Sequence, residues 1–442
     1  MDPRLLPYAQ RNAPRYTSYP SAPHFSADVG ADSYSTWLAA IEPGASLSLY
    51  LHVPYCQQIC WYCGCNTYAT RRDDTLTDFV DVVRREIDLV AAATPARNVR
   101  DIHWGGGTPN ILSPEQFTRI WRHLSFWFDI EESATHAIEI DPRALTAAQA
   151  EAYAGAGVTR ASLGVQDFNP HVQRLIGRLQ PVALVEQAVT TLRNAGVRQI
   201  SMDLMYGLPA QTEADLLLSL NTAVAMAPQR IALFGYAHVP WFKKRQRLID
   251  DTLLPPTERR FDQAEAARAE LVRLGYAPIG LDHFCLPDDE LARATTLHKL
   301  HRNFQGYVVT QTEAILGFGP SAITTLPQGY VQNHHQPGVW ARSIQDEQLP
   351  VARGHRSSQD DRTRRGIIEK LMCEFAADLG PVGGAQAYGQ ALNALAPLAA
   401  DGLVEINGDR ITIPPAARAF CRLAAQAFDA YAQSPTRHSM AI

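Results

Sequence analysis

Four cysteines lie close together in the first part of the chain. Cys56, Cys60, Cys63 and Cys65 form the run Cys-x3-Cys-x2-Cys-x-Cys. Thiolates are soft ligands that select zinc, Cu(I) or an iron–sulfur cluster. A structural zinc site usually pairs two cysteine knuckles across a longer spacer, and no second pair follows this loop. The first three cysteines therefore predict a 4Fe-4S cluster that keeps one iron open for chemistry, unless Cys65 closes it as a fourth ligand.

The composition is that of a globular protein. The chain has 442 residues, 46% of them hydrophobic, and a formal net charge of −5. This mildly acidic balance argues against charge-driven binding of nucleic acid. No apolar stretch reaches the roughly 18 to 20 residues of a membrane-spanning helix, and the first residues do not resemble a secretory signal. We therefore expect a cytoplasmic protein without a membrane partner, in which Cys285, Cys373 and Cys421, scattered among apolar neighbours, are buried packing residues.

Short β-prone runs alternate with longer amphipathic runs through the first half of the chain. This pattern predicts a parallel α/β sheet that closes partly into a TIM-like (β/α)6 barrel. The expected strands are 47–53, 101–104, 137–140, 161–165, 199–204 and 230–234, and the expected helices are 73–93, 113–128, 146–154, 182–195 and 213–227.

Chemically active segments follow directly after these strands. The cysteines follow the first strand, Gly105 to Thr108 follow the second, and Gln166 follows the fourth. Ligands of a parallel barrel bind at the carboxyl ends of its strands. We therefore expect these segments to meet at one mouth.

The remaining segments are expected to surround this barrel. We divide the chain into an N-terminal arm at 1–45 with one helix near 33–40, the barrel at 46–235, a substrate-side extension at 236–358 and a small C-terminal domain at 359–442. The C-terminal segment predicts helices at 362–375 and 386–395, the second of which should stop before Pro397. An Asn407-Gly408 turn then predicts a hairpin, so this domain is expected to be mainly helical and winged-helix-like.

The cysteine run and its flanks resemble a known family. The spacing, with Tyr62 before the last ligand, is similar to that of the radical S-adenosylmethionine superfamily, and YLHVPYCQQICWYCGCN at 50–66 resembles the oxygen-independent coproporphyrinogen III oxidases. The resemblance continues through PRYTSYP at 14–20, HWGGGTP at 103–109, LGVQDFN, MDLMYGLPAQT, HRNFQGY and LGFGPSAI. It implies that S-adenosylmethionine chelates the open iron and is cleaved to a 5′-deoxyadenosyl radical. It also implies that Cys65 is not a cluster ligand.

The resemblance assigns roles to individual residues. Cys56, Cys60 and Cys63 are the implied iron ligands, and Tyr50, Glu139 and Arg178 are the implied catalytic residues. Without the resemblance, a glycine-rich turn is only a tight turn, and each polar residue is only a capping or ion-pairing residue. The implied S-adenosylmethionine contacts, divided between two molecules of it, are Tyr50, Tyr62, Gly106, Gly107, Thr108, Glu139, Gln166, Arg178, Asp203, Ala237 and Ile323.

The substrate implied by the resemblance is coproporphyrinogen III, two of whose propionates become vinyl groups. Arginine clamps carboxylates with two parallel hydrogen bonds, so Arg15 and Arg302, together with Tyr16, are candidate substrate contacts. The segment 14–20 is a candidate lid that excludes water. A flavodoxin or ferredoxin is the expected reductant of a monomeric enzyme. The alternatives are a haem-binding chaperone of the same superfamily and a DNA-binding metalloregulator, and both PRYTSYP and Cys65 favour the oxidase over the chaperone.

Overall fold

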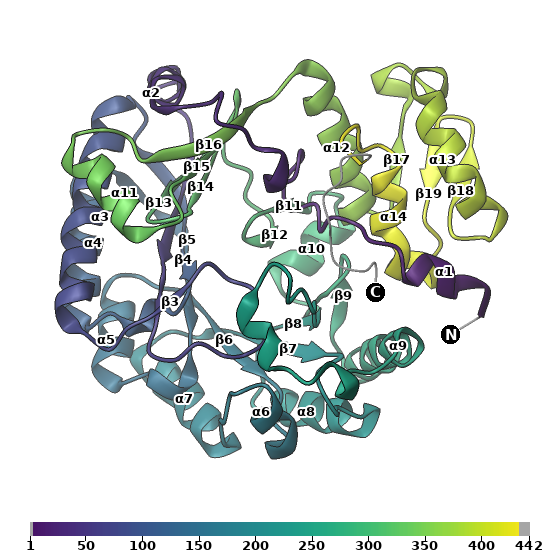
Figure 1. Ribbon diagram of the computed structural model, residues 1–442, viewed down its shortest axis with the longest axis horizontal. Helices are drawn as coiled ribbons and strands as arrows, with labels where there is room; N and C mark the ends of the chain where they lie inside the picture. Colours follow the sequence, from purple (N-terminus) through teal and green to yellow (C-terminus); the bar gives the residue numbers. More distant parts are fainter. Residues whose placement is uncertain (1–2, 433–442) are drawn as a thin grey trace.

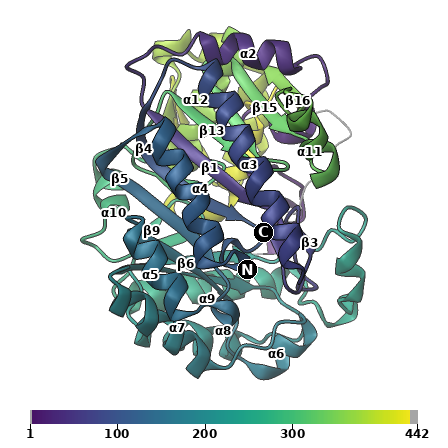
Figure 2. The same cartoon turned by 90° about the vertical axis from the view of Figure 1, so that its left-hand side faces the viewer.

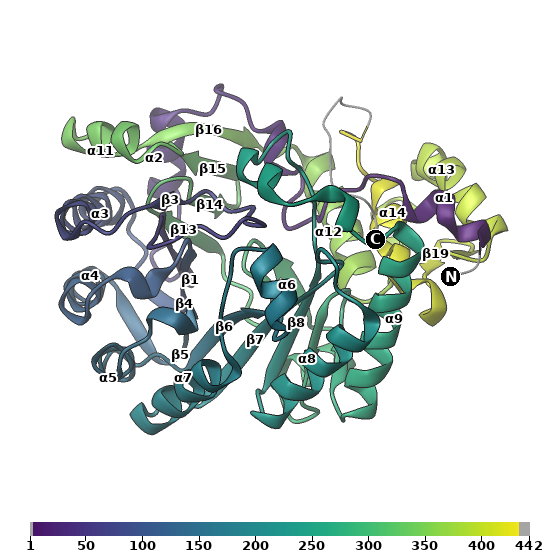
Figure 3. The ribbon, with the colours of Figure 1, turned by 60° about the horizontal axis from the view of Figure 1, so that its bottom comes forward.

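The computed structural model describes residues 3–432, and its centre is a parallel β-sheet. The parallel strands lie in the order β13-β1-β4-β5-β6-β7-β8 and form the curved sheet seen in Figure 3. Their bounds are β1 Leu47–Val53, β4 Asn98–Gly106, β5 Asp129–Ile140, β6 Arg160–Gln166, β7 Gln199–Tyr206, β8 Arg230–Gly235 and β13 Ala314–Phe318. The sequence predicts each of these strands except β13.

Helices cover the outer face of this sheet, as Figure 2 shows for α3, α4 and α5. Ser113, Thr146 and Thr212 each begin a helix with a reciprocal capping box, which explains why the predicted starts agree with the structure to within about two residues. Their apolar faces bury the main core against the sheet. The bounds are α3 Asp73–Ala93, α4 Pro114–Trp127, α5 Ala147–Gly155, α6 Pro170–Leu175, α7 Val182–Ala195, α8 Glu213–Ala225 and α9 Thr257–Arg273.

Antiparallel strands extend the sheet at both edges to 12 strands. Strands β14 Ile323–Leu326, β15 Gly329–Asn333 and β16 Val351–Arg356 continue it beyond β13, while β10 His283–Cys285 and β9 Ala277–Ile279 continue it beyond β8. The end strands β16 and β9 do not pair with each other. The barrel is therefore open, and the predicted partial barrel is confirmed. Shorter elements around it are β2 Tyr55–Cys56, β3 Tyr68–Ala69, α10 Glu290–Thr296, β11 His301–Asn303, β12 Gly306–Val308 and α11 Pro337–Gln345.

The C-terminal segment builds a second core. It contains α12 Gln359–Cys373, β17 Ala376–Asp378, α13 Gly389–Ala400, β18 Glu405–Asn407, β19 Arg410–Thr412 and α14 Cys421–Gln426. Strands β18 and β19 form the predicted hairpin, and β17 joins it. The predicted end before Pro397 is wrong, because α13 continues to Ala400. Pro397 is exposed, as is Asn393, whose carbonyl Pro397 leaves without a helical N–H donor, while Leu395 and Leu398 hold the helix in the core.

The N-terminal arm divides between the two cores. Its first part contains α1 Leu6–Ala9 and packs Tyr8, Tyr16 and Tyr19 into the C-terminal core, so α1 lies beside the C-terminal domain in Figure 1. Its second part contains α2 Ala31–Ala39, which packs on the barrel core. The arm thus spans the face of the molecule between them. None of the helices among residues 3–432 has the length and apolar composition needed to cross a membrane.

Candidate active site

A cavity of about 210 Å³ lies where the parallel strands end. The loop after β1 brings Cys56, Cys60 and Cys63 to its wall, as the order of strands and loops predicts. Other predicted residues that line the same cavity are Tyr62, Gly106, Gly107, Thr108, Glu139, Gln166, Arg178 and Asp203.

Each of the three sulfur atoms has a polar neighbour. Cys56 Sγ lies 3.1 Å from the Thr108 hydroxyl, and Cys60 Sγ accepts a hydrogen bond from Arg178 Nη1 at 3.3 Å. The backbone N–H of Cys65 donates to Cys63 Sγ at 3.4 Å, and the interactions with Cys65 outweigh burial and lower the pKa of Cys63 to about 6. Donors that stabilise a thiolate also favour its binding to metal.

These thiols suit a multi-iron cluster. Among residues 3–432, no three His, Cys, Asp or Glu side chains are arranged to hold a single metal ion. Soft thiolates around one cavity are the donor set of an iron–sulfur cluster. Cys56, Cys60 and Cys63 would hold it, with Cys65 as a neighbour on the same wall.

Arg178 connects the cysteine loop to the sheet. It is 6% exposed, and its Nη2 donates to the Gly164 carbonyl at 2.6 Å and lies 3.2 Å from Asp141 Oδ1. Burial alone would lower the pKa of Arg178, but Tyr62, Asp141 and Cys60 together raise it, so the guanidinium stays charged. Its buried Nε has no hydrogen-bond partner among residues 3–432. That donor fits the carboxylate of a bound amino acid such as S-adenosylmethionine.

The turn after β4 needs glycine for space. A Cβ on Gly106, whose φ is +107°, would lie 2.6 Å from the His52 ring, and one on Gly107 would lie 2.7 Å from the Tyr55 carbonyl oxygen. The N–H groups of Gly107 and Thr108 already donate to Val53 and Tyr55 at 2.8 and 2.9 Å. The turn is therefore anchored to the cysteine loop through its N–H groups, and its glycines have no Cβ that would keep a ligand away from the backbone.

Two carboxyl groups with oppositely shifted pKa values share the cavity. Glu139 Oε1 accepts a hydrogen bond from His103 Nε2 at 3.1 Å and Oε2 accepts one from Gly106 N at 3.3 Å. Burial works to raise the pKa of Glu139, but His103 outweighs it and lowers that pKa. Burial, followed by the charge of Glu139, raises the pKa of Asp203 to about 6. Asp203 therefore takes up a proton at a higher pH than Glu139 does. Beside them, Gln166 has a left-handed φ of +71°, a backbone conformation that is uncommon outside glycine.

Other predicted residues lie outside this cavity. Tyr50 is in β1, with its hydroxyl 3.2 Å from His52 Nδ1 and its ring stacked on His103, which itself binds Glu139. Ile323 begins β14. Tyr16 is 5% exposed and donates to Asp429 Oδ2 at 3.0 Å.

The predicted residues Ala237, Arg15 and Arg302 line a second cavity. Gln246 joins the walls of the two cavities, because its amide donates both to the Tyr62 carbonyl at 2.8 Å and to the Ala237 carbonyl at 3.2 Å.

Several residues of the site have no predicted role. Thr67 lies 3.2 Å from Cys56 Sγ, and Arg143 binds Asp141 at 2.6 Å while its Nη2 lies 3.7 Å from Cys60 Sγ. The signal for Asp141 and Arg143 was their place directly after a predicted strand. Thr67 has no comparable signal. Cys285, Cys373 and Cys421 are buried, as predicted.

The open barrel, its cysteine cavity and a match to a family model define this chain as a radical SAM enzyme. Residues 50–223 match the family model of the radical SAM superfamily.

Longer similarities identify the family more narrowly. The chain is 48% identical over 430 residues to the oxygen-independent coproporphyrinogen III oxidase of Bradyrhizobium diazoefficiens, covering 96% of each protein. It is 36% identical to that of Escherichia coli, covering 99% of this chain and 96% of the relative. The solved structure of coproporphyrinogen III oxidase (HemN) from Escherichia coli superposes with a TM-score of 0.90, covering 94% of this chain and 97% of that one. The chain belongs to the oxygen-independent coproporphyrinogen III oxidase family.

Proposed function

We propose that this chain is a coproporphyrinogen dehydrogenase that converts two propionates of coproporphyrinogen III to vinyl groups in haem biosynthesis, giving protoporphyrinogen IX. Each propionate loses a β-hydrogen, carbon dioxide and one electron. The observation that carries the proposal is the wall of the cysteine cavity, where three thiols, the Gly106–Gly107 turn, Glu139 and Arg178 meet in a chain 48% identical to a named oxidase.

The cluster and S-adenosylmethionine, when bound, supply the one-electron chemistry that generates the hydrogen-abstracting radical. The protein positions these groups. Cys56, Cys60 and Cys63 hold the cluster, Arg178 offers its buried Nε to a carboxylate, and Glu139 accepts hydrogen bonds from an ammonium or ribose hydroxyl.

The remaining assignments belong to the same proposal. Two S-adenosylmethionine molecules would be divided between the cysteine cavity and the wall near Ala237. Tyr50 would act through His103, and Ile323 would contact S-adenosylmethionine from the start of β14. Arg15 and Arg302 are the proposed substrate contacts, and Tyr16 acts as the anchor of the arm. A cytoplasmic monomer that binds neither nucleic acid nor membrane remains a prediction from the sequence.

The proposed reductant is a small acidic electron-transfer protein, such as a flavodoxin or ferredoxin. A basic loop lies against the cysteine loop, because Lys243 Nζ donates to the Cys65 carbonyl at 3.2 Å. The same loop exposes Lys244, Arg245 and Arg247, and its Phe242 is 74% exposed. Complementary charge of this kind steers an acidic partner and speeds its association.

An anaerobic assay tests the proposal. Purified protein is incubated with coproporphyrinogen III, S-adenosylmethionine and a reductant, and vinyl product and 5′-deoxyadenosine are measured. The expected result is both products, with iron and sulfide bound to the protein. Stable retention of haem without turnover would instead favour the chaperone, and one zinc ion bound by the cysteines would refute the radical chemistry.

A further inference from the structure

A second cavity, about twice the volume of the cysteine cavity, lies outside it. It has a volume of about 440 Å³ and is lined by the ends of β7 and β8, by α9, by the N-terminal arm and by the segment around α14. Its wall contains six arginines, Arg15, Arg260, Arg268, Arg302, Arg418 and Arg422, but only the carboxylates of Glu265 and Asp282 among the described lining residues. This excess of positive charge needs a physical explanation.

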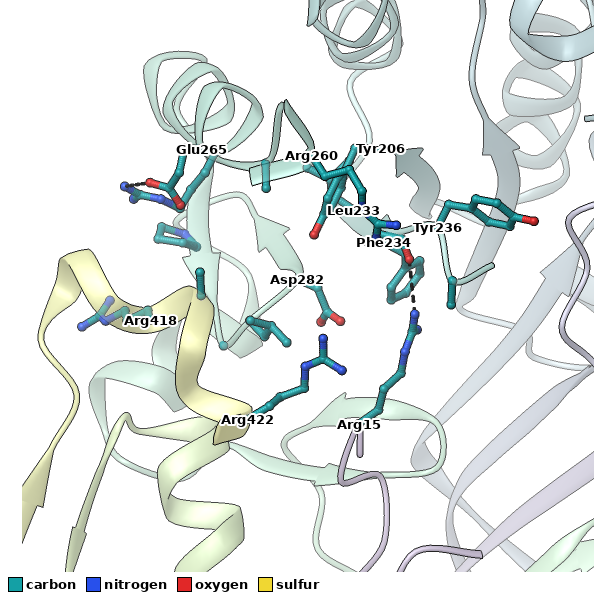
Figure 4. A pocket seen from close by; sticks show the side chains of 18 of the residues that line it. Arg15, Tyr206, Leu233, Phe234, Tyr236, Arg260, Glu265, Asp282, Arg418 and Arg422 are labelled. Carbon is teal, nitrogen blue, oxygen red and sulfur yellow. Dashed lines mark hydrogen bonds and ion pairs between the residues drawn. The ribbon is translucent and has the colours of Figure 1, made fainter. Parts of the chain in front are cut away.

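Four of these arginines converge from distant parts of the sequence. Arg15 comes from the arm, Arg260 from α9, Arg302 from β11 and Arg422 from α14. Figure 4 shows Arg15, Arg260 and Arg422 directed into the same space, with Asp282 between them. Arg15 Nη2 donates to the Gly235 carbonyl at 3.3 Å, and Arg422 Nη1 donates to the Ala13 carbonyl at 3.1 Å. Neutral backbone groups thus help to hold both guanidinium groups at the wall of the cavity.

The two carboxylates already have other partners. Glu265 pairs with Arg268 on the same helix at 3.3 Å. Asp282 lies 3.8 Å from Arg302 Nη1 and 2.8 Å from His283 Nδ1. Although burial works to raise the pKa of Asp282, Arg302 and His283 hold it well below its usual value, so this carboxylate is ionised.

Arg260 has the clearest capacity for a ligand. It is 8% exposed, and its Nε has no hydrogen-bond partner among residues 3–432. Burial lowers its pKa despite the nearby Tyr206, and the charge of Arg15 lowers it further. Burial and Arg15 likewise lower the pKa of Arg422 to about 10. Buried cations that repel one another are costly unless an anion pairs with them.

The rest of the wall suits a large, partly apolar ligand. Leu233, Phe234, Leu254 and Phe284 line the cavity between the arginines. Ala237 lies on the same wall and connects to the cysteine loop through Gln246. A ligand here would therefore reach from the arginines toward the predicted reaction site.

We propose that this cavity binds the carboxylates of the tetrapyrrole substrate, with Arg260 and Arg422 as substrate-binding residues beside Arg15 and Arg302, and with the apolar wall against the pyrrole rings. The inference rests on the proposed function, because that function supplies a ligand with four propionates. Guanidinium groups that approach from different elements can each bind one carboxylate through two parallel hydrogen bonds.

Binding of oxidised coproporphyrin III, which is fluorescent and does not react, tests this assignment without turnover. Its Kd is measured anaerobically with the iron-loaded protein. Arg260→Gln removes a guanidinium whose Nε has no hydrogen-bond partner in the described structure. We expect the Kd of Arg260→Gln to be about tenfold to a hundredfold higher than that of the wild type, because the variant loses a hydrogen bond to a charged group. The Kd of Arg260→Lys should lie between those of the wild type and Arg260→Gln.

Three controls accompany this binding test. Arg119→Gln removes an arginine of α4 that pairs with Asp81 of α3 and does not line the cavity, and its Kd should equal that of the wild type. Mesoporphyrin IX, which has two propionates, should lose less affinity in Arg260→Gln than coproporphyrin III does. Iron content equal to that of the wild type verifies that each variant is folded.

The outcomes separate this inference from the proposed function. If Arg260→Gln and Arg15→Gln both bind coproporphyrin III as tightly as the wild type does, the carboxylate assignment is wrong, even where the wild type forms vinyl product. If the wild type binds coproporphyrin III through Arg260 but forms no vinyl product, the cavity assignment stands and the proposed reaction fails.

Discussion

Replacing Glu139 by glutamine tests whether the carboxylate at the end of β5 holds S-adenosylmethionine. The side chain of Glu139 is 42% exposed to the cavity and already accepts hydrogen bonds from His103 and Gly106. A carboxylate has about four acceptor positions, so Glu139 keeps positions for a ribose hydroxyl or an ammonium group. Glutamine has nearly the same volume but only one acceptor oxygen and no charge.

The expected magnitude follows from these contacts. The lowered pKa of Glu139 means that the side chain is charged at neutral pH. A hydrogen bond to a charged group contributes about 1.5 to 3 kcal/mol, and losing one raises a Kd about tenfold to a hundredfold. Because Glu139 is not a predicted iron ligand, Glu139→Gln should weaken S-adenosylmethionine binding by this factor while the iron content stays that of the wild type.

Anaerobic equilibrium dialysis with labelled S-adenosylmethionine measures this Kd. Glu131 provides a matched control, because it lies near the other end of β5 and pairs with Arg100 at 2.8 Å, away from the cavity. Glu131→Gln should bind S-adenosylmethionine as the wild type does. A Kd for Glu139→Gln within about twofold of the wild type would show that this carboxylate does not hold the cofactor.

Three further predictions concern the cysteine loop, the basic loop and a buried carboxyl group. Cys65→Ser should keep its iron, whereas Cys60→Ser should lose it; equal losses by iron analysis would make Cys65 a ligand. Lys244→Glu should slow cluster reduction by a flavodoxin about tenfold at low salt, and stopped-flow rates that do not depend on salt would contradict this. Burial raises the pKa of Glu86 from 4.5 to about 8 despite bonds from Gly319, Asn333 and Trp340. Between these pKa values the folded state keeps a proton that the unfolded state releases. The free energy of unfolding should therefore fall as the pH rises from 4.5 to about 8, by at most about 1.4 kcal/mol per pH unit. In Glu86→Gln, the free energy of unfolding measured with a denaturant should not show this fall.

The sequence predicts the barrel well because its signals are local. A βα unit carries its own periodicity, and helix caps such as Ser113 and the left-handed Gly196 mark where helices begin and end. The sequence does not predict that β13 pairs in parallel with β1. Leu47 and Ala314 meet in this pair, although they are far apart in the chain, and a short apolar run does not specify its distant partner.

The same reasoning applies to the site. The cysteine spacing is a local signal, and strand order brings the three thiols to Glu139 and Arg178. The arginine cavity depends instead on how the two ends of the chain pack. Arg260 and Arg422 have no sequence motif that connects them, so only the folded structure shows that they share a wall with Arg15.

The position of Arg15 depends on the contact between the arm and the C-terminal domain. Tyr16 donates to Asp429 at 3.0 Å, and the N–H of Ala430 donates to the Tyr19 hydroxyl at 3.0 Å. Both tyrosines are buried in the C-terminal core. The segment predicted as a lid is therefore anchored directly after Arg15 by both tyrosines. Opening the cavity by moving the arm alone would break these hydrogen bonds and expose both rings, whereas a movement of the arm together with α14 would preserve them.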